Sequence, residues 1–304
     1  MSEILENINN FTNKRKKIRS FVLLGILVLF IAFYILVLKG PKLVEPVSIH
    51  VSKGDKISVI AGRLEEENIV QSSRLLQSFV AFLGGDGRIK PGDYYFDKPI
   101  SLPQVAYRLA KGIHNIDAVK VTFPEGSDNT ELAKILNNKL PAIDIEMFSS
   151  EISDLQGELF PDTYFFYPLT TFDEIVSILR DTFDKKTQEL LAQGYKDYSK
   201  QEILVMASII EKEANGPEDR NIISGILWKR LEKGMLLQVD AAPITYKEKG
   251  LPDKPITNSG IASIRAAINP EESRYLFYLH DKDGNIHLAE DFAGHKSNIR
   301  KYLR

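Results

Sequence analysis

An uncharged apolar segment stands near the beginning of the chain, at residues 21–38. At 1.5 Å rise per residue, a helix of this length would cover about 27 Å of a hydrocarbon layer roughly 30 Å thick. A cleaved signal peptide is the alternative, but its apolar stretch has only about 7–15 residues and ends at a small-residue cleavage site. Residues 39–44 offer no such site. The pattern therefore predicts an uncleaved transmembrane helix after a tail of residues 1–20.

After this segment, the spacing of apolar residues changes from alternation to helical periodicity and back. Alternating apolar residues over 47–51 predict a short half-buried strand. Helical spacing follows over 56–67 and again over 72–83, where a serine pair can cap the second helix. The aromatic run 93–96 predicts a second strand. These elements form a compact module of strand, helix, helix and strand.

A second small unit is predicted next. The pattern gives a helix over 101–112, a strand over 118–123 and a helix that begins near Asp128. Tandem small units of this kind are more typical of a spacer or binding module than of a catalytic core. The composition then changes at 157–168, where five aromatic residues and two prolines crowd together. Such a segment suits the apolar face of a sugar, but it equally suits an aromatic corner of the core.

The segment 201–213 is apolar on nearly all sides, which predicts a helix buried inside its domain. Two acids lie near its end, and at 100° per residue Glu211 and Glu213 point to different flanks. A carboxyl group above the small Ala207 can line a cleft, where desolvation raises its pKa toward the range of a general acid. Glu211 is therefore a candidate acid, with a solvated helix end as the alternative interpretation.

A further helix follows over 217–233, where a proline stands near its first turn and a glycine ends it. Beyond it, Gln238 and Asp240 occupy alternate positions of an extended segment, so they share one face and could position a substrate beside Glu211. Near the end of the chain, Asp283 and the glycine after it predict a hairpin turn between strands 275–280 and 286–289.

Charge is distributed unevenly along the 304 residues, although the net charge is only −2. The tail 1–20 has an excess of cations, whereas the part beyond residue 39 carries more acids than bases. The positive-inside rule then predicts a cytoplasmic tail and an exported body, and the acidic body argues against a nucleic-acid partner. The chain has no cysteine, which excludes disulfides, thiolate zinc sites, iron–sulfur clusters and a cysteine nucleophile.

Three segments resemble the MltG (YceG-like) endolytic murein transglycosylases in sequence, order and spacing. They are 157–164 (GELFPDTY), 207–213 (ASIIEKE) and 229–240 (KRLEKGMLLQVD). The resemblance covers essentially the whole chain, including the apolar N-terminal segment and a LysM-like module. It implies an α+β fold with a single transmembrane helix at 21–38, a LysM-like small α+β module at 46–116, a second small α/β unit at 117–155 and an α+β catalytic domain at 156–304.

The resemblance also implies an enzyme that cuts nascent peptidoglycan strands between N-acetylmuramic acid and N-acetylglucosamine, at the outer face of the cytoplasmic membrane. Glu211 matches the catalytic acid, which would protonate the glycosidic oxygen and then accept the proton of the C6 hydroxyl as a 1,6-anhydro ring closes. No cofactor or metal is implied, and the expected partners are glycan strands, the membrane and a peptidoglycan synthase. The substrate-binding candidates are Gln238, Asp240, Asp162, Tyr164, Thr245, Tyr246 and Glu213.

The chain departs from the family pattern between Asp240 and Thr245, where a few tens of residues are missing. This predicted deletion motivates an alternative, a member that has lost activity and acts as an anchored peptidoglycan-binding or scaffold protein. A metal hydrolase is a further alternative, because His280, His287 and His295 stand near several aspartates, but no pair has the spacing of a helical zinc motif.

Overall fold

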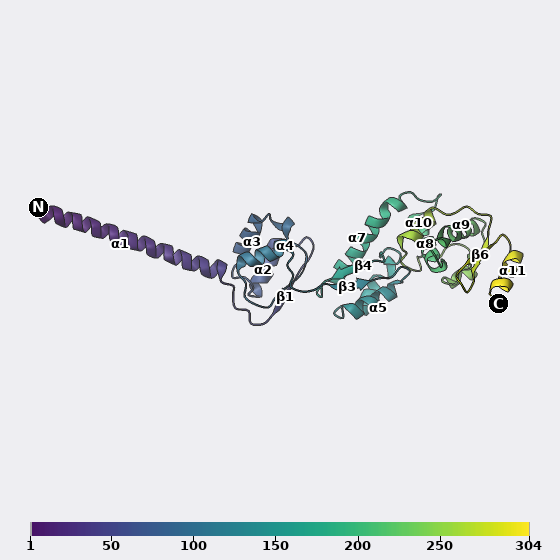
Figure 1. The fold of residues 1–304 in the computed structure, drawn as a ribbon, viewed down its shortest axis with the longest axis horizontal. Helices are drawn as coiled ribbons and strands as arrows, with labels where there is room; N and C mark the ends of the chain where they lie inside the picture. The colour runs from purple at the N-terminus through teal and green to yellow at the C-terminus, as the bar shows by residue number, and fades with distance from the viewer. Residues whose placement is uncertain (1, 304) are drawn as a thin grey trace. The chain divides into compact units, whose positions relative to one another are not determined.

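A computed structural model describes residues 2–303, with side chains for residues 17–303 except 36, 145 and 147. The chain divides into two compact units, of which the first ends at Asp117 and the second begins at Ala118. Helices and three two-stranded antiparallel sheets make up the two units (Figure 1). This mixture of helices and small sheets confirms the predicted α+β class.

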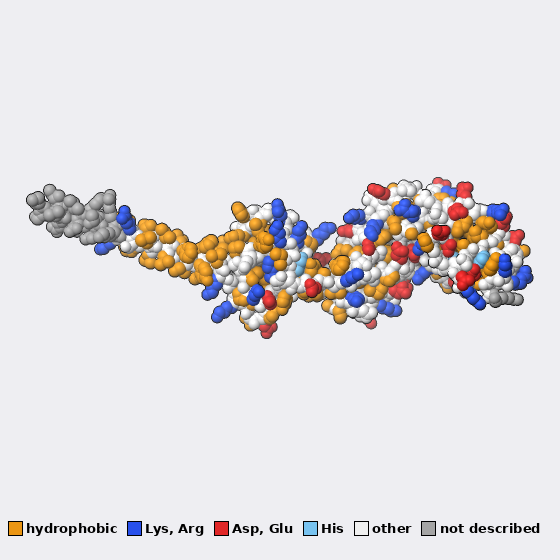
Figure 2. Space-filling model, in the orientation of Figure 1, with side chains coloured by type: hydrophobic (Ala, Val, Ile, Leu, Met, Phe, Trp, Pro, Cys, Tyr) orange, Lys and Arg blue, Asp and Glu red, His pale blue; other side chains and the backbone are white. Residues whose placement is uncertain are grey.

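The first unit begins with the helix α1 (Ser2–Phe33), which continues as a π-helix, η1 (Tyr34–Leu38). No helix within residues 2–303 combines the length and the apolar character that crossing a membrane requires. The predicted transmembrane helix at 21–38 is therefore not supported by the structure. Most large apolar side chains of this segment are exposed, although Val37 is buried, and Figure 2 shows the exposed ones as a hydrophobic surface along α1.

The predicted module of strand, helix, helix and strand is present in the first unit. The elements of the first unit after η1 are β1 (Val47–Val51), α2 (Ile57–Glu66), α3 (Ser73–Phe82), the short 3-10 helix η2 (Asp86–Arg88), β2 (Gly92–Phe96) and α4 (Leu102–Lys111). The sequence pattern assigns α4 to the second small unit, whereas its apolar side chains pack in the core of the first unit. The strands β1 and β2 pair in antiparallel register, with Val47 opposite Phe96. The Ser72 side chain accepts a hydrogen bond from the Leu75 amide and so caps α3, as the sequence predicts.

The second unit contains two more two-stranded antiparallel sheets and a set of packed helices. Its elements are β3 (Val119–Thr122), α5 (Asn129–Lys139), α6 (Ile145–Glu151), η3 (Ser153–Leu155), β4 (Thr163–Phe166), α7 (Phe172–Leu191), α8 (Lys200–Glu213), α9 (Asp219–Glu232), η4 (Pro243–Tyr246), α10 (Ile261–Ile268), β5 (Phe277–His280), β6 (Ile286–Ala289) and α11 (Phe292–Tyr302). The hairpin predicted around Asp283 is confirmed as β5 and β6.

The predicted unit 117–155 and the predicted catalytic domain 156–304 lie within one compact unit. Two contacts explain this. Strand β3 pairs with β4, so the sheet joins one predicted part to the other. The buried Asn258 side chain also accepts hydrogen bonds from the amides of Gly157 and Leu159, at 2.8 and 3.2 Å, and donates to Ser127 and Asn129.

The core of the second unit is built around α8, in which the eight consecutive residues 203–210 are all buried. This confirms the helix predicted to be apolar on all sides. Helix α10 packs against α8, and α9 is fixed to α10 by the Trp228 indole N–H, which donates to the carbonyl of Ala267 at 2.9 Å. Helix α8 begins at a capping box, in which Ser199 and Glu202 exchange hydrogen bonds. This packing fixes where the last turn of α8 presents its acids.

Candidate functional site

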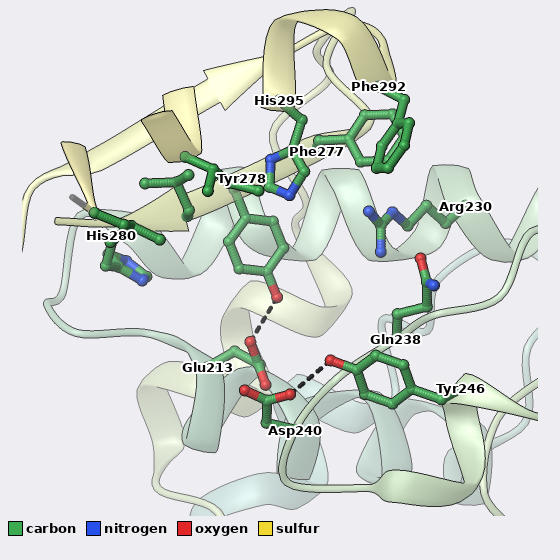
Figure 3. A pocket seen from close by; sticks show the side chains of 13 residues that line it. Glu213, Arg230, Gln238, Asp240, Tyr246, Phe277, Tyr278, His280, Phe292 and His295 are labelled. Atoms are coloured by element: carbon green, nitrogen blue, oxygen red, sulfur yellow. Dashed lines mark hydrogen bonds between the residues drawn. The ribbon is translucent and has the colours of Figure 1, made fainter. Parts of the chain in front are cut away.

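A cavity of about 440 Å³ opens beside the last turn of α8 (Figure 3). Its walls come from the C-terminal end of α8, from α9, from the segment 238–246, from β5 and from α11. The lining residues are Glu213, Arg230, Gln238, Asp240, Tyr246, Phe277, Tyr278, Leu279, His280, Phe292, His295, Ile299 and Leu303. The volume lies within the range of roughly 300–1,000 Å³ that is common for small-molecule sites.

Glu213, the last residue of α8, lines this cavity together with a second acid, Asp240. Burial raises the pKa of Glu213, and the charge of Asp240 adds to the increase. The Tyr278 hydroxyl donates a hydrogen bond of 2.8 Å to Glu213 Oε2 and opposes part of that rise in pKa. A carboxyl group with a raised pKa keeps its proton closer to neutral pH, which is the property of a general acid.

Gln238 and Asp240 lie in the same cavity, as their alternate spacing predicts. The Tyr246 hydroxyl donates to Asp240 Oδ1 at 2.6 Å and thereby orients the carboxylate. Gln238 has a backbone φ of 53°, in the left-handed region that residues with a side chain rarely adopt. The backbone N–H of Gln238 donates to the carbonyl of Thr245 at 3.1 Å, which helps hold this conformation. A strained residue whose side chain lines a pocket is a mark of a functional site.

Glu211 lies outside the cavity. Its side chain is 6% exposed, accepts a 2.9 Å hydrogen bond from the Gly260 amide and lies 3.6 Å from the Arg220 guanidinium. Gln238 and Asp240 therefore share the cavity with Glu213 and not with Glu211. Two residues along a helix turn the side chain by about 200°, so the flank that meets the 238–240 segment carries Glu213.

A second carboxylate approaches Glu211 from the loop after β3. Burial raises the pKa of Glu125, and the neighbouring charge of Glu211 raises it further. The Glu125 carboxyl group packs so closely on Gly260 that a Cβ atom there would stand 2.0 Å from Glu125 Oε1. These contacts connect the 124–127 loop, the end of α8 and the beginning of α10.

Three other candidates do not line this cavity. Asp162 pairs with Lys186 at 2.6 Å, and this hydrogen bond lowers the pKa of Asp162. Tyr164 is buried in the core and donates to the carbonyl of Phe160, and its burial raises the pKa to about 12. Thr245 is buried, and its hydroxyl contacts the backbone of 239 and 242. Of the two interpretations of the aromatic segment, these contacts favour the core corner.

Sequence reasoning missed several residues of the cavity, Arg230, Phe277 and Tyr278 among them. Their signal in the sequence is weak, because Arg230 is a single cation on the largely buried helix α9 and the other two lie in a short strand. The histidines that motivate the metal-hydrolase alternative contact different aspartates. His280 pairs with Asp219 at 3.0 Å and His287 pairs with Asp281 at 2.8 Å. Among the residues described, no group of three potential ligands converges.

Comparison with known proteins gives the family. Residues 49–244 and 244–301 match the model of the YceG-like family, which is most of the chain. The chain belongs to the YceG-like family. A relative from Bacillus subtilis (strain 168), named endolytic murein transglycosylase, is 26% identical over 324 aligned positions that cover 88% of this chain and 89% of that protein. A relative of the same name from Streptococcus pneumoniae (strain D39) is 22% identical, and the match covers 84% of this chain and 58% of that protein.

A solved structure is also similar. The crystal structure of a YceG-like protein from Listeria monocytogenes superimposes with a TM-score of 0.52 and 25% sequence identity, covering 83% of this chain and 99% of that chain. The likeness extends over both compact units, since it covers so much of each chain.

The family match is broken at one place, Ile244, where the first matched segment ends and the second begins. The alignment with the Bacillus subtilis protein is 324 positions long, which exceeds the 304 residues of this chain, so that relative has residues without a counterpart here. The break lies where the sequence predicts a deletion, between Asp240 and Thr245. In this chain the short helix η4 spans the position and places Tyr246 against Asp240.

Proposed function

We propose that this YceG-like protein is a lytic transglycosylase that cleaves peptidoglycan glycan strands, with Glu213 as its acid. The observation that carries the proposal is the carboxyl group of Glu213, desolvated in a cavity that also holds Gln238, Asp240 and Tyr246. The relatives named endolytic murein transglycosylase support the substrate class.

One carboxyl group is enough for this reaction. The protonated acid gives its proton to the glycosidic oxygen as the bond from C1 of the muramoyl residue to that oxygen breaks. The resulting carboxylate accepts the proton of the C6 hydroxyl of the same residue, while O6 bonds to C1 and forms the 1,6-anhydro ring. The proton balance closes and no water is consumed, so the second carboxylate that activates water in inverting glycosidases is not needed.

The choice between the two acids rests on what each contacts. Glu211, the acid expected from the resemblance, is engaged by the Gly260 amide and by Arg220 and does not line the cavity. Glu213 lines the cavity beside Asp240 (Figure 3). Glu211 therefore suits a positioning role, in which it fixes the end of α8, and Glu213 suits proton transfer.

The experiment is digestion of uncrosslinked glycan strands, followed by mass analysis of the ends. We expect 1,6-anhydro ends from the wild-type chain, a loss of at least 100-fold for Glu213→Gln, and a smaller loss for Glu211→Gln. Reducing ends would mean hydrolysis and would refute the transglycosylase assignment. Full activity of Glu213→Gln together with an inactive, folded Glu211→Gln would return the catalytic role to Glu211.

We further propose that residues 21–38 hold the protein at the cytoplasmic membrane, with the second unit on the outer face. The support is the uncharged segment, its exposed side chains such as Leu29 at 71%, and the cations that precede it. Cell fractionation tests this, with Leu29→Arg in the segment and Phe82→Arg as the control at an exposed apolar position outside it. Recovery of the unmodified chain in the soluble fraction would contradict the proposal.

A second candidate is a family member that binds glycan strands without cleaving them. The break in the family match at Ile244, which adjoins the cavity, favours it. Binding of strands without any new ends, under conditions in which a related transglycosylase produces them, would support this candidate over the enzyme.

A further inference from the structure

The cavity has two chemically different halves. Glu213 and Asp240 form an acidic half, and each receives a hydrogen bond from a tyrosine. Arg230, His295 and Phe277 form the other half, which is cationic and aromatic (Figure 3). A ligand that fills the cavity must therefore suit a proton donor at one end and a cation at the other.

Arg230 is held rigidly in its half of the cavity. Its side chain is 6% exposed, its Nε donates to the carbonyl of Leu276 at 2.6 Å, and its Nη1 donates to the carbonyl of Leu237 at 2.7 Å. The guanidinium carbon lies 4.9 Å from the centre of the Phe277 ring. Both polar contacts are to backbone carbonyls, so they orient the group without neutralising its charge.

The side chains that the structure describes form no ion pair with Arg230, although the charge of Glu213 in the same cavity raises the pKa of Arg230 against the larger effect of burial. Among the side chains that the structure describes, no carboxylate lies within 4 Å of the Arg230 guanidinium, and only two of its five N–H groups have the partners named above. A buried cation without a counter-ion is costly, and proteins normally pair it. Burial lowers the pKa of Arg230, as expected for a cation removed from water.

His295 adds a second unused polar group to the same half. Its Nδ1 is buried and has no hydrogen-bond partner. The imidazole stacks on Phe277 with ring centres 5.3 Å apart. Burial lowers the pKa of His295, and the charge of Arg230 contributes, so the ring is neutral at pH 7 and offers one donor and one acceptor.

We propose that Arg230, with His295 beside it, binds the carboxyl-derived oxygens of the 3-O-lactyl group of the muramoyl residue, an inference that rests on the function proposed above. Of the two sugars in the strand, only the muramoyl residue carries such a group. The lactyl group and the scissile bond belong to the same ring, so one sugar can contact both halves of the cavity. The planar fork of an arginine suits a pair of carboxyl oxygens.

The lactyl group exists in two forms, a carboxylate in peptide-free strands and an amide in strands that keep their peptides. The oxygen acceptor is common to both. A charge-assisted hydrogen bond is about twice as strong as a neutral one, so the unpaired cation should favour the peptide-free form.

The test measures binding, in the Glu213→Gln background of the full chain, so that ligands are not consumed. Calorimetry compares three ligands of equal length: an N-acetylglucosamine oligomer, a peptide-free glycan of alternating sugars and the peptide-bearing glycan. We expect the peptide-free glycan to bind about 10- to 100-fold more tightly than the oligomer, with the peptide-bearing glycan between them. Equal affinity for all three ligands would overturn the proposal at this stage, before any variant of Arg230 is measured.

Substitution of Arg230 then assigns the discrimination to this residue. Arg230→Gln should remove the preference and change affinity for the oligomer by no more than about threefold. The matched control is Lys229→Gln, because Lys229 is also a cation of α9 that donates to a backbone carbonyl, that of Ser273, but it does not line this cavity. Loss of the preference in the control, or uniform weakening for all three ligands by Arg230→Gln in a protein with unchanged thermal unfolding, would refute the assignment. If the protein shows the preference among the three ligands but its wild-type form cleaves no glycan, the proposed enzyme function is refuted and the proposed role of Arg230 in binding is not.

Discussion

The substitution Tyr278→Phe removes one hydrogen bond from the proposed acid and leaves the ring in place. The lost contact is the 2.8 Å bond from Tyr278 Oη to Glu213 Oε2, which favours the charged carboxylate. A hydrogen bond to a charged group contributes about 1.5–3 kcal/mol, and water in the cavity will replace part of it. If about 1.4 kcal/mol is lost, the pKa of Glu213 rises by about one unit, because 1.36 kcal/mol corresponds to one unit.

The direction of the effect on activity follows from the role of the acid. The reaction needs the protonated form of Glu213, so activity falls as pH rises through its pKa. In Tyr278→Phe this fall should occur about one pH unit higher than in the wild type. The measurement is the pH dependence of kcat/KM for glycan cleavage, together with an NMR titration of the labelled Glu213 side chain, which does not require activity.

The matched control is Tyr246→Phe in the same cavity. Its hydroxyl donates to Asp240 and not to Glu213, so we expect the pH profile to move by only a few tenths of a unit. An unchanged or lower transition in Tyr278→Phe, or an equal shift in the control, would refute the assignment of Glu213 as the group that titrates.

Three further predictions concern stability. The pKa of Glu213 is higher in the folded than in the unfolded state, so the wild type loses stability as pH rises through these two values. The variant Glu213→Gln should therefore have a higher Tm than the wild type at pH 7. Below about pH 4, where the wild-type carboxyl group is protonated in both states, the two Tm values should be equal. Asn258→Ala leaves the Gly157 amide and other buried groups unpaired, and we expect a loss of roughly 3–5 kcal/mol in urea unfolding. Trp228→Phe removes the bond to Ala267 and should cost about 2 kcal/mol, measured by circular dichroism because the chain has no other tryptophan. No change in the last two would mean that these bonds are not formed in solution.

Local elements of the fold could be predicted because their signals are local. The boundaries of α8, the cap at Ser72 and the hairpin around Asp283 depend on residues close together in sequence. The pairing of β3 with β4 could not be predicted, because about 40 residues separate the strands and each is short enough to pair elsewhere. The division into units depended on that pairing.

The site shows the same limit. Helical geometry places Glu211 and Glu213 on different flanks, and this much follows from the sequence. Which flank faces a cavity depends on what packs against α8, and there Glu211 contacts Arg220 of the next helix and Gly260, which is 49 residues away. Tyr278 reaches Glu213 from a strand 65 residues away, a contact that no spacing rule indicates.

The left-handed backbone of Gln238 sets stability against activity at one position. A non-glycine residue in a sparsely populated backbone region costs of order 1–3 kcal/mol, which glycine would avoid. Laboratory evolution for thermal tolerance alone should therefore enrich glycine at 238 and, in doing so, delete an amide from the cavity. Evolution under selection for glycan processing should retain the costlier residue.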